Sequence, residues 1–310
     1  MNVSTVHVPI LLKPIVEALI EPFLALPESA PPHAIIDCTL GGGGHTGALI
    51  QALAAQPKTA RHKVISLDQD EGAVERAKER FKKEIAEGKL FVIRSRFSEV
   101  DRAVESAGFP ILGMMADLGF SSDQIEDAER GLSFMRQGPL DMRLDPAHGH
   151  SVYEFLNKVT EKELEQVLSE LGEERFSKRI ASAIIQARRG RQLPDTTTAL
   201  AELVVRALPP PARHGRIHAA TRTFQALRIH VNEEMKELDQ LLARAIILLK
   251  PGGRLAVLSF HSLEDRKVKL AFREDESFRA LTKKPIEADD QEVRENPRAR
   301  SAKLRIGERT

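Results

Sequence analysis

The sequence predicts an α/β fold, a Rossmann-like parallel sheet with an antiparallel edge strand, interrupted by a helical insertion. Three observations lead to this prediction. Four glycines at positions 41–44 separate a short apolar strand from a helix. Short apolar runs alternate with helical stretches through the first third of the 310 residues, and a strand pattern returns near residue 254 after a helix-rich middle. A parallel sheet with crossover helices produces this alternation.

Strands are expected in the first third of the chain at residues 35–36, 63–67, 90–93 and 111–116. Acids follow three of them, namely Asp37, Asp68 and Asp117. The carboxyl ends of parallel strands meet at one edge of a sheet, and ligands bind at that edge in open α/β folds. The three acids are therefore candidate site residues.

The middle of the chain is predicted to be helical. Thr160 and Glu163 form a capping box at the start of a helix, and Gly172 is placed to end that helix. Further helices are expected over 176–187, from 197 to the prolines at 209–211, and over 221–249, before a buried strand at 254–260 and an edge strand at 302–306. The predicted domains are a discontinuous sheet domain, residues 1–124 and 216–310, and an inserted helical domain, residues 125–215.

The glycine-rich segment is typical of a cofactor loop, because glycines let a ligand approach backbone N–H groups at a helix N-terminus. Gly42, Gly44 and Gly47 satisfy G-x-G-x-x-G, with Asp68 about 20 residues later, as in dinucleotide folds. Asp37 stands just before the glycines. Its carboxylate would repel a pyrophosphate by roughly 1 to 4 kcal/mol and attract the ammonium of S-adenosylmethionine by a similar amount. The charge favours S-adenosylmethionine over NAD, and a purely structural glycine turn is the third interpretation.

Composition excludes several classes of protein. One cysteine excludes a disulfide framework, and no apolar run approaches the roughly 20 residues of a membrane helix. The first residues lack the basic and apolar regions of a signal peptide, so a cytoplasmic protein without a membrane partner is expected. The net charge is +1, but arginines and lysines cluster at 175–191, 213–228 and 298–305. Such clusters bind nucleic acid or form solvated helix faces.

Six ordered segments carry a resemblance to one family: DCTLGGGGH at 37–45, DLGFSSDQ at 117–124, RGLSF at 130–134, GPLDMRLD at 138–145, ATRTFQALRI at 220–229 and SFHSLEDR at 259–266. In these segments, and from His7 to Arg305, the chain resembles the bacterial small-subunit ribosomal RNA cytosine-N4 methyltransferases, the RsmH or MraW family. Three positions of this chain depart from the usual pattern of the family, namely Phe120, Asp123 and Ala219. They put the local loop shape in question, but none is a presumed donor-binding acid.

The resemblance implies a class I S-adenosylmethionine-dependent methyltransferase with an inserted helical domain. It also implies methylation of the exocyclic N4 of cytosine 1402 in the decoding centre of 16S ribosomal RNA. The expected partner is this RNA in the assembled 30S subunit, and the sequence leaves naked RNA open as the alternative substrate. The oligomeric state is not indicated. The donor contacts that carry over onto matching positions are Gly43, Gly44, His45, Asp68, Phe97, Asp117 and Gln124. Among them, Asp68 can accept hydrogen bonds from both ribose hydroxyls, and Phe97 is either an adenine-stacking face or an ordinary core side chain. Asp37 is added to them by its charge.

The single cysteine bears on which atom of the base is methylated. Methylation at C5 of a pyrimidine needs a covalent nucleophile, normally a cysteine, and Cys38 precedes the loop on a strand where a base is not expected to reach it. An exocyclic amine needs orientation and a proton acceptor. Asp117, or the backbone carbonyl of Leu118, is the candidate acceptor, with in-line positioning supplying most of the rate.

Contacts with the RNA are assigned to Phe120, Arg222, Arg228 and His261. Phe120 is a candidate for stacking on the extruded base, with packing as the alternative, and His261 has helix capping as its alternative. No metal is expected, because His148, His150 and Asp145 lack the pattern of a binding motif. A nicotinamide oxidoreductase and a non-catalytic RNA-binding factor remain as alternative functions.

Overall fold

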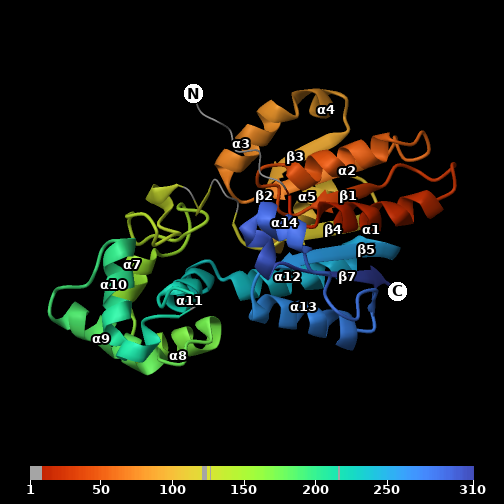
Figure 1. Ribbon diagram of the computed structural model, residues 1–310. Coiled ribbons are helices and arrows are strands. Elements are labelled where there is room, and N and C mark those ends of the chain that lie inside the picture. Colours follow the sequence, from red (N-terminus) through yellow and green to blue (C-terminus); the bar gives the residue numbers. More distant parts are fainter. Residues whose placement is uncertain (1–8, 121–123, 126, 216) are drawn as a thin grey trace. The chain divides into compact units, whose positions relative to one another are not determined.

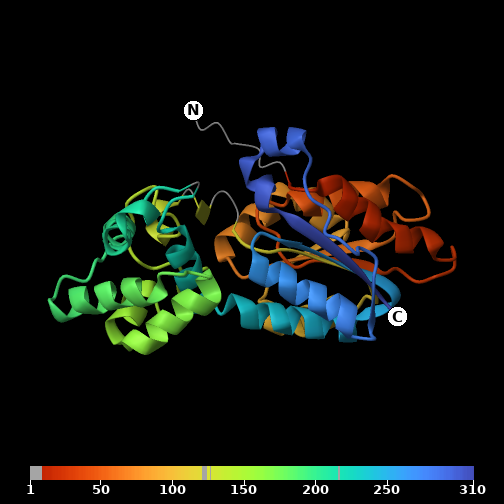
Figure 2. The same cartoon turned by 60° about the horizontal axis from the view of Figure 1, so that its bottom comes forward.

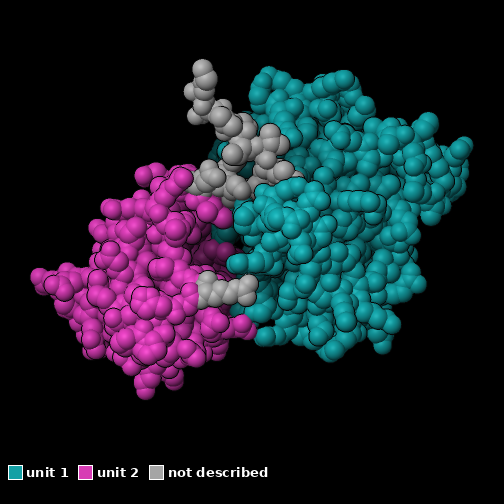
Figure 3. Space-filling model, viewed as in Figure 1, with its two compact units in different colours: residues 1–120, 236–310 teal, residues 121–235 magenta. Residues whose placement is uncertain are grey.

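The computed structural model describes residues 9–120, 124–125, 127–215 and 217–310. Residues 7, 8 and 121–123, which entered the family resemblance, lie outside this part. The chain divides into two compact units, residues 1–120 with 236–310 and residues 121–235 (Figure 3). The inserted domain was predicted to end at residue 215. The helical unit continues to 235, because the helix after residue 220 packs into its core.

The first unit is built on a seven-stranded sheet in the order β3-β2-β1-β4-β5-β7-β6. Strands β1 to β5 are parallel, and β7 pairs antiparallel with both β5 and β6. The Rossmann-like parallel sheet and the antiparallel strand are confirmed, but that strand is not at the edge, since β6 pairs with its outer side. The strands are β1 (Ala34–Asp37), β2 (Lys63–Asp68), β3 (Leu90–Arg94), β4 (Ile111–Asp117), β5 (Leu249–Ser259), β6 (Phe278–Ala280) and β7 (Lys303–Arg309).

Helices cover both faces of this sheet. Apolar side chains of α1, α2 and α3 share one core cluster with residues of the strands, and Figures 1 and 2 show α12 and α13 on the opposite face. The α-helices of this unit are α1 (Leu12–Ala25), α2 (Gly44–Ala54), α3 (Glu71–Arg80), α4 (Lys82–Ala86), α5 (Val100–Ala107), α12 (Glu234–Leu248), α13 (Ser262–Glu274) and α14 (Asp290–Glu295). Short 3-10 turns are η1 (Phe97–Glu99) and η4 (Pro297–Ser301).

The second unit is helical. The capping box of Thr160 and Glu163 is confirmed at the start of α8. A Cβ on Gly172 would lie 2.6 Å from the Arg222 carbonyl oxygen, so α8 and α11 pack backbone to backbone. The helices are α7 (Val152–Lys158), α8 (Glu161–Gly172), α9 (Ser177–Arg189), α10 (Thr197–Ala207) and α11 (Thr221–Val231), with 3-10 turns η2 (Ala128–Arg130) and η3 (Pro210–Ala212).

The single helix predicted over 221–249 is wrong. The chain forms α11 and then α12, and Glu233 between them adopts a left-handed φ of 49°. Asn232 fixes the break: its side-chain amide donates to the Met142 carbonyl, and its side-chain oxygen accepts from the Leu144 N–H, both at 2.8 Å. An apolar pattern cannot report a break that depends on side-chain bonds to a distant loop.

Among the residues that the structure describes, no helix has both the length and the apolar character to cross a membrane.

Candidate functional site

The glycine loop turns the chain sharply between β1 and α2. Gly41 and Gly43 have positive φ values of 48° and 75°, which residues with a side chain adopt only at a cost. A Cβ on Gly44 would lie 2.4 Å from Cγ of Pro9, whereas one on Gly42 would meet nothing within 4 Å. The loop therefore needs glycine for its backbone and for packing on one side, and it faces open space at Gly42.

This open side lies beside the N-terminus of α2. The N–H groups in the first turn of a helix have no partner within the helix and carry a partial positive charge. In α2 these groups belong to Gly44, His45 and Thr46. At the C-terminal end of α3, the Arg80 guanidinium donates to the Gly42 carbonyl and stacks over the Phe81 ring, which supports the loop. An elongated polar ligand can thus bind the loop through backbone groups.

Asp37 lies inside the fold, with no exposed surface. Its carboxylate accepts hydrogen bonds from the Thr46 hydroxyl at 2.7 Å and from the Thr39 N–H at 3.1 Å. The Thr46 hydroxyl is also 2.8 Å from that of Ser66 on β2. Asp37 therefore holds the loop on the sheet. The contact between Asp37 and the donor stays a prediction. Both carboxylate oxygens of Asp37 accept hydrogen bonds from residues in or next to the loop.

Asp68 ends β2 and faces the same loop. One carboxylate oxygen accepts from the Gly41 N–H and the other from the Asp70 N–H, both at 2.9 Å. Burial raises the pKa of Asp68 to about 6, against the lowering effect of these two backbone bonds. Each oxygen keeps further acceptor capacity. The pair of ribose hydroxyls predicted for this position fits those two oxygens.

Asp117 ends β4 and is joined to His45. The closest atoms, His45 Nδ1 and Asp117 Oδ2, are 3.8 Å apart, and His45 Nε2 is 3.1 Å from the Ile10 carbonyl oxygen. Because a carbonyl only accepts, Nε2 carries a proton. The pKa of Asp117 is raised to about 6: burial is the largest cause, His45 and Arg298 act to lower it, and Asp37 acts to raise it. The sheet edge thus joins two acids with pKa values near neutrality.

The residues that follow Asp117 are held to the sheet. The Leu118 N–H donates to the Leu258 carbonyl on β5 at 2.8 Å. The Phe120 side chain is buried, which favours the packing interpretation, and its carbonyl accepts a hydrogen bond from the Arg298 guanidinium. Phe97, predicted as an adenine-stacking face, is half-buried in η1 just after β3.

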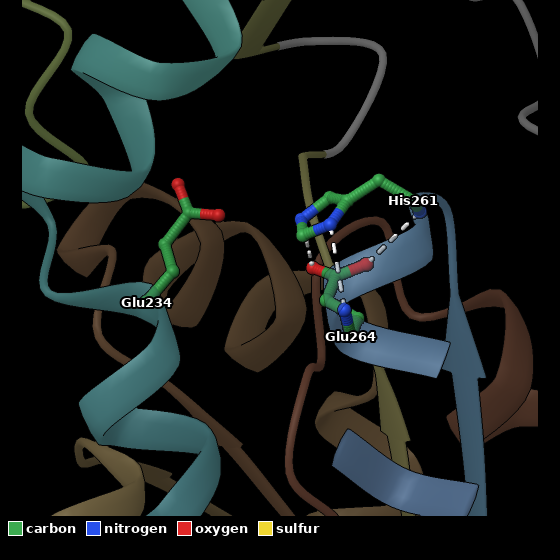
Figure 4. A group of neighbouring side chains, drawn as sticks. All are labelled: Glu234, His261 and Glu264. Carbon is green, nitrogen blue, oxygen red and sulfur yellow. Dashed lines mark hydrogen bonds and ion pairs between the residues drawn. The ribbon is translucent and has the colours of Figure 1, made fainter. Parts of the chain in front are cut away.

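His261 begins α13 as its N-cap. Figure 4 shows its ring beside the Glu264 carboxylate, with His261 Nε2 and Glu264 Oε1 3.1 Å apart. Together they form a capping box: the ring Nδ1 accepts from the Glu264 N–H, and the Glu264 side chain accepts from the His261 N–H. Helix capping, the alternative for His261, is therefore observed, and contact with RNA stays a prediction.

The remaining predicted site residues belong to the helical unit. Gln124 is buried near its beginning. Arg222 is exposed and donates to the Glu173 carbonyl, whereas Arg228 forms a two-bond ion pair with Glu234, with both distances 2.8 Å. Figure 4 also draws Glu234, on α12. Because Glu234 neutralises it, Arg228 is a weaker candidate for a phosphate contact than the sequence suggested.

The basic clusters of the helical unit are partly structural. Arg188 donates to the carbonyls of Leu156 and Val159 at 2.9 and 2.7 Å. Arg179 and Arg213 also donate to backbone carbonyls. Such arginines complete the ends of neighbouring helices. Of the three residues considered for a metal, His148 and Asp145 pair with each other, with His148 Nδ1 and Asp145 Oδ2 2.8 Å apart.

Three residues of the site were missed in the sequence analysis. Thr39 accepts from the Asp117 N–H through its hydroxyl at 2.7 Å, Glu264 accepts from the Phe260 N–H at 2.9 Å, and Arg298 holds the Phe120 carbonyl. Thr39 and Glu264 stand in segments that carried the family resemblance, and Arg298 stands in the basic cluster at 298–305. The roles of Thr39 and Arg298 depend on contacts between segments far apart in sequence, which no local pattern reports, whereas Glu264 completes the capping box of α13, which is a local signal.

A doubly wound sheet with acids at the ends of β1, β2 and β4, and a glycine loop that opens α2, defines a Rossmann-like methyltransferase of class I. The open loop, its backbone donors and the acceptor oxygens of Asp68 fit S-adenosylmethionine, which is the cofactor of this enzyme.

The chain belongs to the MraW methylase family, whose model matches residues 4–310. It is 48% identical to a protein of Synechococcus sp. and 44% identical to one of Persephonella marina, each named ribosomal RNA small subunit methyltransferase H. The matches cover 89% of this chain in both cases, and 85% and 92% of those proteins. A crystal structure of an rRNA methylase from Streptococcus thermophilus is 12% identical, with a TM-score of 0.40 over 95% of this chain and 91% of that one.

Proposed function

We propose that the protein transfers a methyl group from S-adenosylmethionine to the exocyclic N4 of cytosine 1402 in the decoding centre of 16S ribosomal RNA, within the assembled 30S subunit. Relatives named as small-subunit ribosomal RNA methyltransferases support ribosomal RNA as the substrate. The observation that favours an exocyclic amine as the methylated group lies at the end of β4. There an acid and a backbone carbonyl follow each other beside the cofactor loop.

The hydrogen bonds around β5 support the Leu118 carbonyl as an acceptor. The Leu118 N–H donates to the Leu258 carbonyl of β5. If the parallel pairing of β4 and β5 continued by one more hydrogen bond, the Leu118 carbonyl would accept from the N–H of Phe260. That N–H donates instead to Glu264 at 2.9 Å. Glu264 thus ends the ladder and leaves the carbonyl to accept from a bound amine.

The proposed mechanism uses orientation more than covalent chemistry. When bound, S-adenosylmethionine supplies an electrophilic methyl group on its sulfonium. The Leu118 carbonyl and the Asp117 carboxylate accept the two N–H groups of the cytosine amine and point its nitrogen at that methyl. As the N–C bond forms and the S–C bond breaks, the nitrogen becomes positive and loses a proton. Asp117, with its pKa near 6, accepts it and passes it to solvent.

The experiment that tests the function is transfer of a tritiated methyl group to 30S subunits that lack the modification, followed by mapping of the labelled nucleotide. We expect label on N4 of cytosine 1402 and little label on free 16S RNA. Label on another base or atom would overturn the proposed target, and no incorporation with intact donor binding would overturn the enzyme. Incorporation into free RNA at the same rate would remove the assembled subunit from the proposal.

Two variants test the chemistry. Asp117→Asn keeps the shape of the side chain and removes its charge, and we expect transfer at saturating donor to fall by roughly 10²-fold or more. Transfer within a few-fold of the wild type would rule out the catalytic role of the carboxylate. Cys38→Ala should keep transfer within a few-fold, because this thiol is buried and burial raises its pKa. A loss of transfer by a folded Cys38→Ala protein would instead favour C5 chemistry.

A further inference from the structure

The segment that follows Asp117 is anchored from the other end of the chain. Arg298, on η4, donates from its guanidinium to the backbone carbonyl of Phe120, 178 residues away in sequence. Phe120 is three residues beyond Asp117 and two beyond Leu118. The anchor therefore acts on the same short stretch of backbone that carries the proposed amine acceptors.

This stretch needs an anchor because of Gly119. Its φ is 106°, a conformation that a glycine adopts readily, and it has no side chain that could pack and hold it. On one side the Leu118 N–H is fixed by β5. On the other side the Phe120 carbonyl accepts a hydrogen bond from Arg298. The two bonds hold the backbone on either side of Gly119, next to the Leu118 carbonyl.

Arg298 is itself held in place. Asn296 caps η4 and accepts a hydrogen bond from the Arg298 N–H at 3.2 Å. The next residue, Ala299, is 1% exposed and belongs to the core cluster of the sheet unit. A side chain that starts from such a backbone loses little further freedom when it binds its partner.

The charge of Arg298 also reaches the acid. It lowers the pKa of Asp117, against the effect of burial, and burial lowers the pKa of Arg298 itself. Removing the guanidinium would thus change both the geometry of the segment and the proton affinity of its carboxylate.

We propose that Arg298 is a positioning residue for methyl transfer: it fixes the backbone from Asp117 to Phe120 so that the Leu118 carbonyl and the Asp117 carboxylate face the target amine. The inference rests on the proposed function for the role of those two acceptors. Arg298 itself touches neither the donor nor the base in this proposal.

The test compares Arg298→Met, Arg298→Lys and Arg294→Met in the full chain. Arg294 is an exposed residue of the neighbouring α14, so its replacement controls for loss of one positive charge. Single-turnover transfer at saturating donor and saturating 30S subunits gives the rate of the methyl step, and calorimetric titration gives the Kd of S-adenosylmethionine. Thermal melting reports whether each variant is folded.

We expect Arg298→Met to lower the rate at least 10-fold while the donor Kd changes less than 3-fold, Arg298→Lys to recover part of the rate, and Arg294→Met to match the wild type. The apparent pKa of the rate profile should rise in Arg298→Met, which a merely structural role would not produce. A wild-type rate and profile in Arg298→Met would overturn the inference. Equal losses of rate, donor binding and melting temperature in both Arg298 variants would overturn it as well.

Failure of the proposed function has a different signature. If the wild type labels another atom, that function is wrong, whatever Arg298 does. If the wild type labels N4 and Arg298→Met labels it at the same rate, only the positioning role is wrong.

Discussion

The hydroxyl of Thr39 accepts a hydrogen bond from the N–H of Asp117 at 2.7 Å, and this bond ties the end of β1 to the end of β4. Thr39 also donates its own N–H to Asp37 at 3.1 Å. The cofactor loop and the proposed catalytic acid are therefore coupled through one side chain. Thr39 thus fixes the backbone of Asp117 relative to Asp37.

Replacing Thr39 by valine tests that coupling. The change keeps the shape and leaves the Asp117 N–H without its acceptor, which costs roughly 1 to 3 kcal/mol when the group is buried. We expect a lower free energy of unfolding in urea and weaker binding of the donor. Thr39→Ser keeps the hydroxyl and is the control. If both variants bind and unfold like the wild type, the bond does not organise the site.

Replacing Gly43 by alanine tests the shape of the loop. The φ of 75° alone costs an alanine about 1 kcal/mol, and the new Cβ would lie 2.7 Å from the buried ring of Phe81. Gly88 has a φ of 63° and nothing within 4 Å of its Cβ position, so Gly88→Ala carries the backbone cost without the contact. We expect Gly43→Ala to be the less stable variant in urea and to lose donor binding. Equal stability of the two would show that Phe81 adjusts freely.

The affinity for S-adenosylmethionine should depend on pH through Asp68. The pKa of Asp68 is raised to about 6 in the free protein, and ribose hydroxyls donate to the ionised form. The donor Kd is therefore expected to increase as pH falls through 6, by at most about tenfold per pH unit. In Asp68→Asn this dependence should disappear and the Kd at pH 8 should rise about 10- to 100-fold. A Kd independent of pH in the wild type would contradict the ribose contact.

Asp117 should make the stability of the free protein depend on pH. Its pKa is 3.8 in the unfolded reference and about 6 in the fold, so the folded state binds the proton more tightly. The resulting stabilisation is present below pH 3.8 and is lost as pH rises through 6. We expect Asp117→Asn to melt above the wild type at pH 7.5, and by a clearly smaller margin at pH 4.5. A difference of the same size at both pH values would contradict the raised pKa.

Much of the fold follows from local patterns. The strands β1 to β5 were predictable because each contains a short apolar run, and the turn after β1 was predictable from its four glycines. β6 was not, since three residues that pair only with β7 leave no periodic signal. For the same reason the antiparallel strand was predicted at the edge, where its alternating pattern fits equally well.

The site residues that were predictable are acids that directly end a strand. Asp68 and Asp117 lie at the sheet edge that parallel order demands. The partners of individual side chains were not predictable: Asp37 is enclosed by Thr39 and Thr46, and Arg228 is paired with Glu234. Charge and composition give the inventory of groups, and only the packed chain decides which of them neutralise one another.

The place of the helical unit in the chain has a consequence for how such an enzyme can be dissected. It enters after Phe120 and leaves before Lys236, within the crossover from β4 to β5. The rest of that crossover, α12, keeps its own bonds to the sheet unit, including Glu237 to the Ser98 N–H. Joining residue 120 to residue 236 through a short linker would leave a complete βαβ connection. The insertion is thus a module in the architectural sense, and the sheet unit is a candidate for a minimal donor-binding domain.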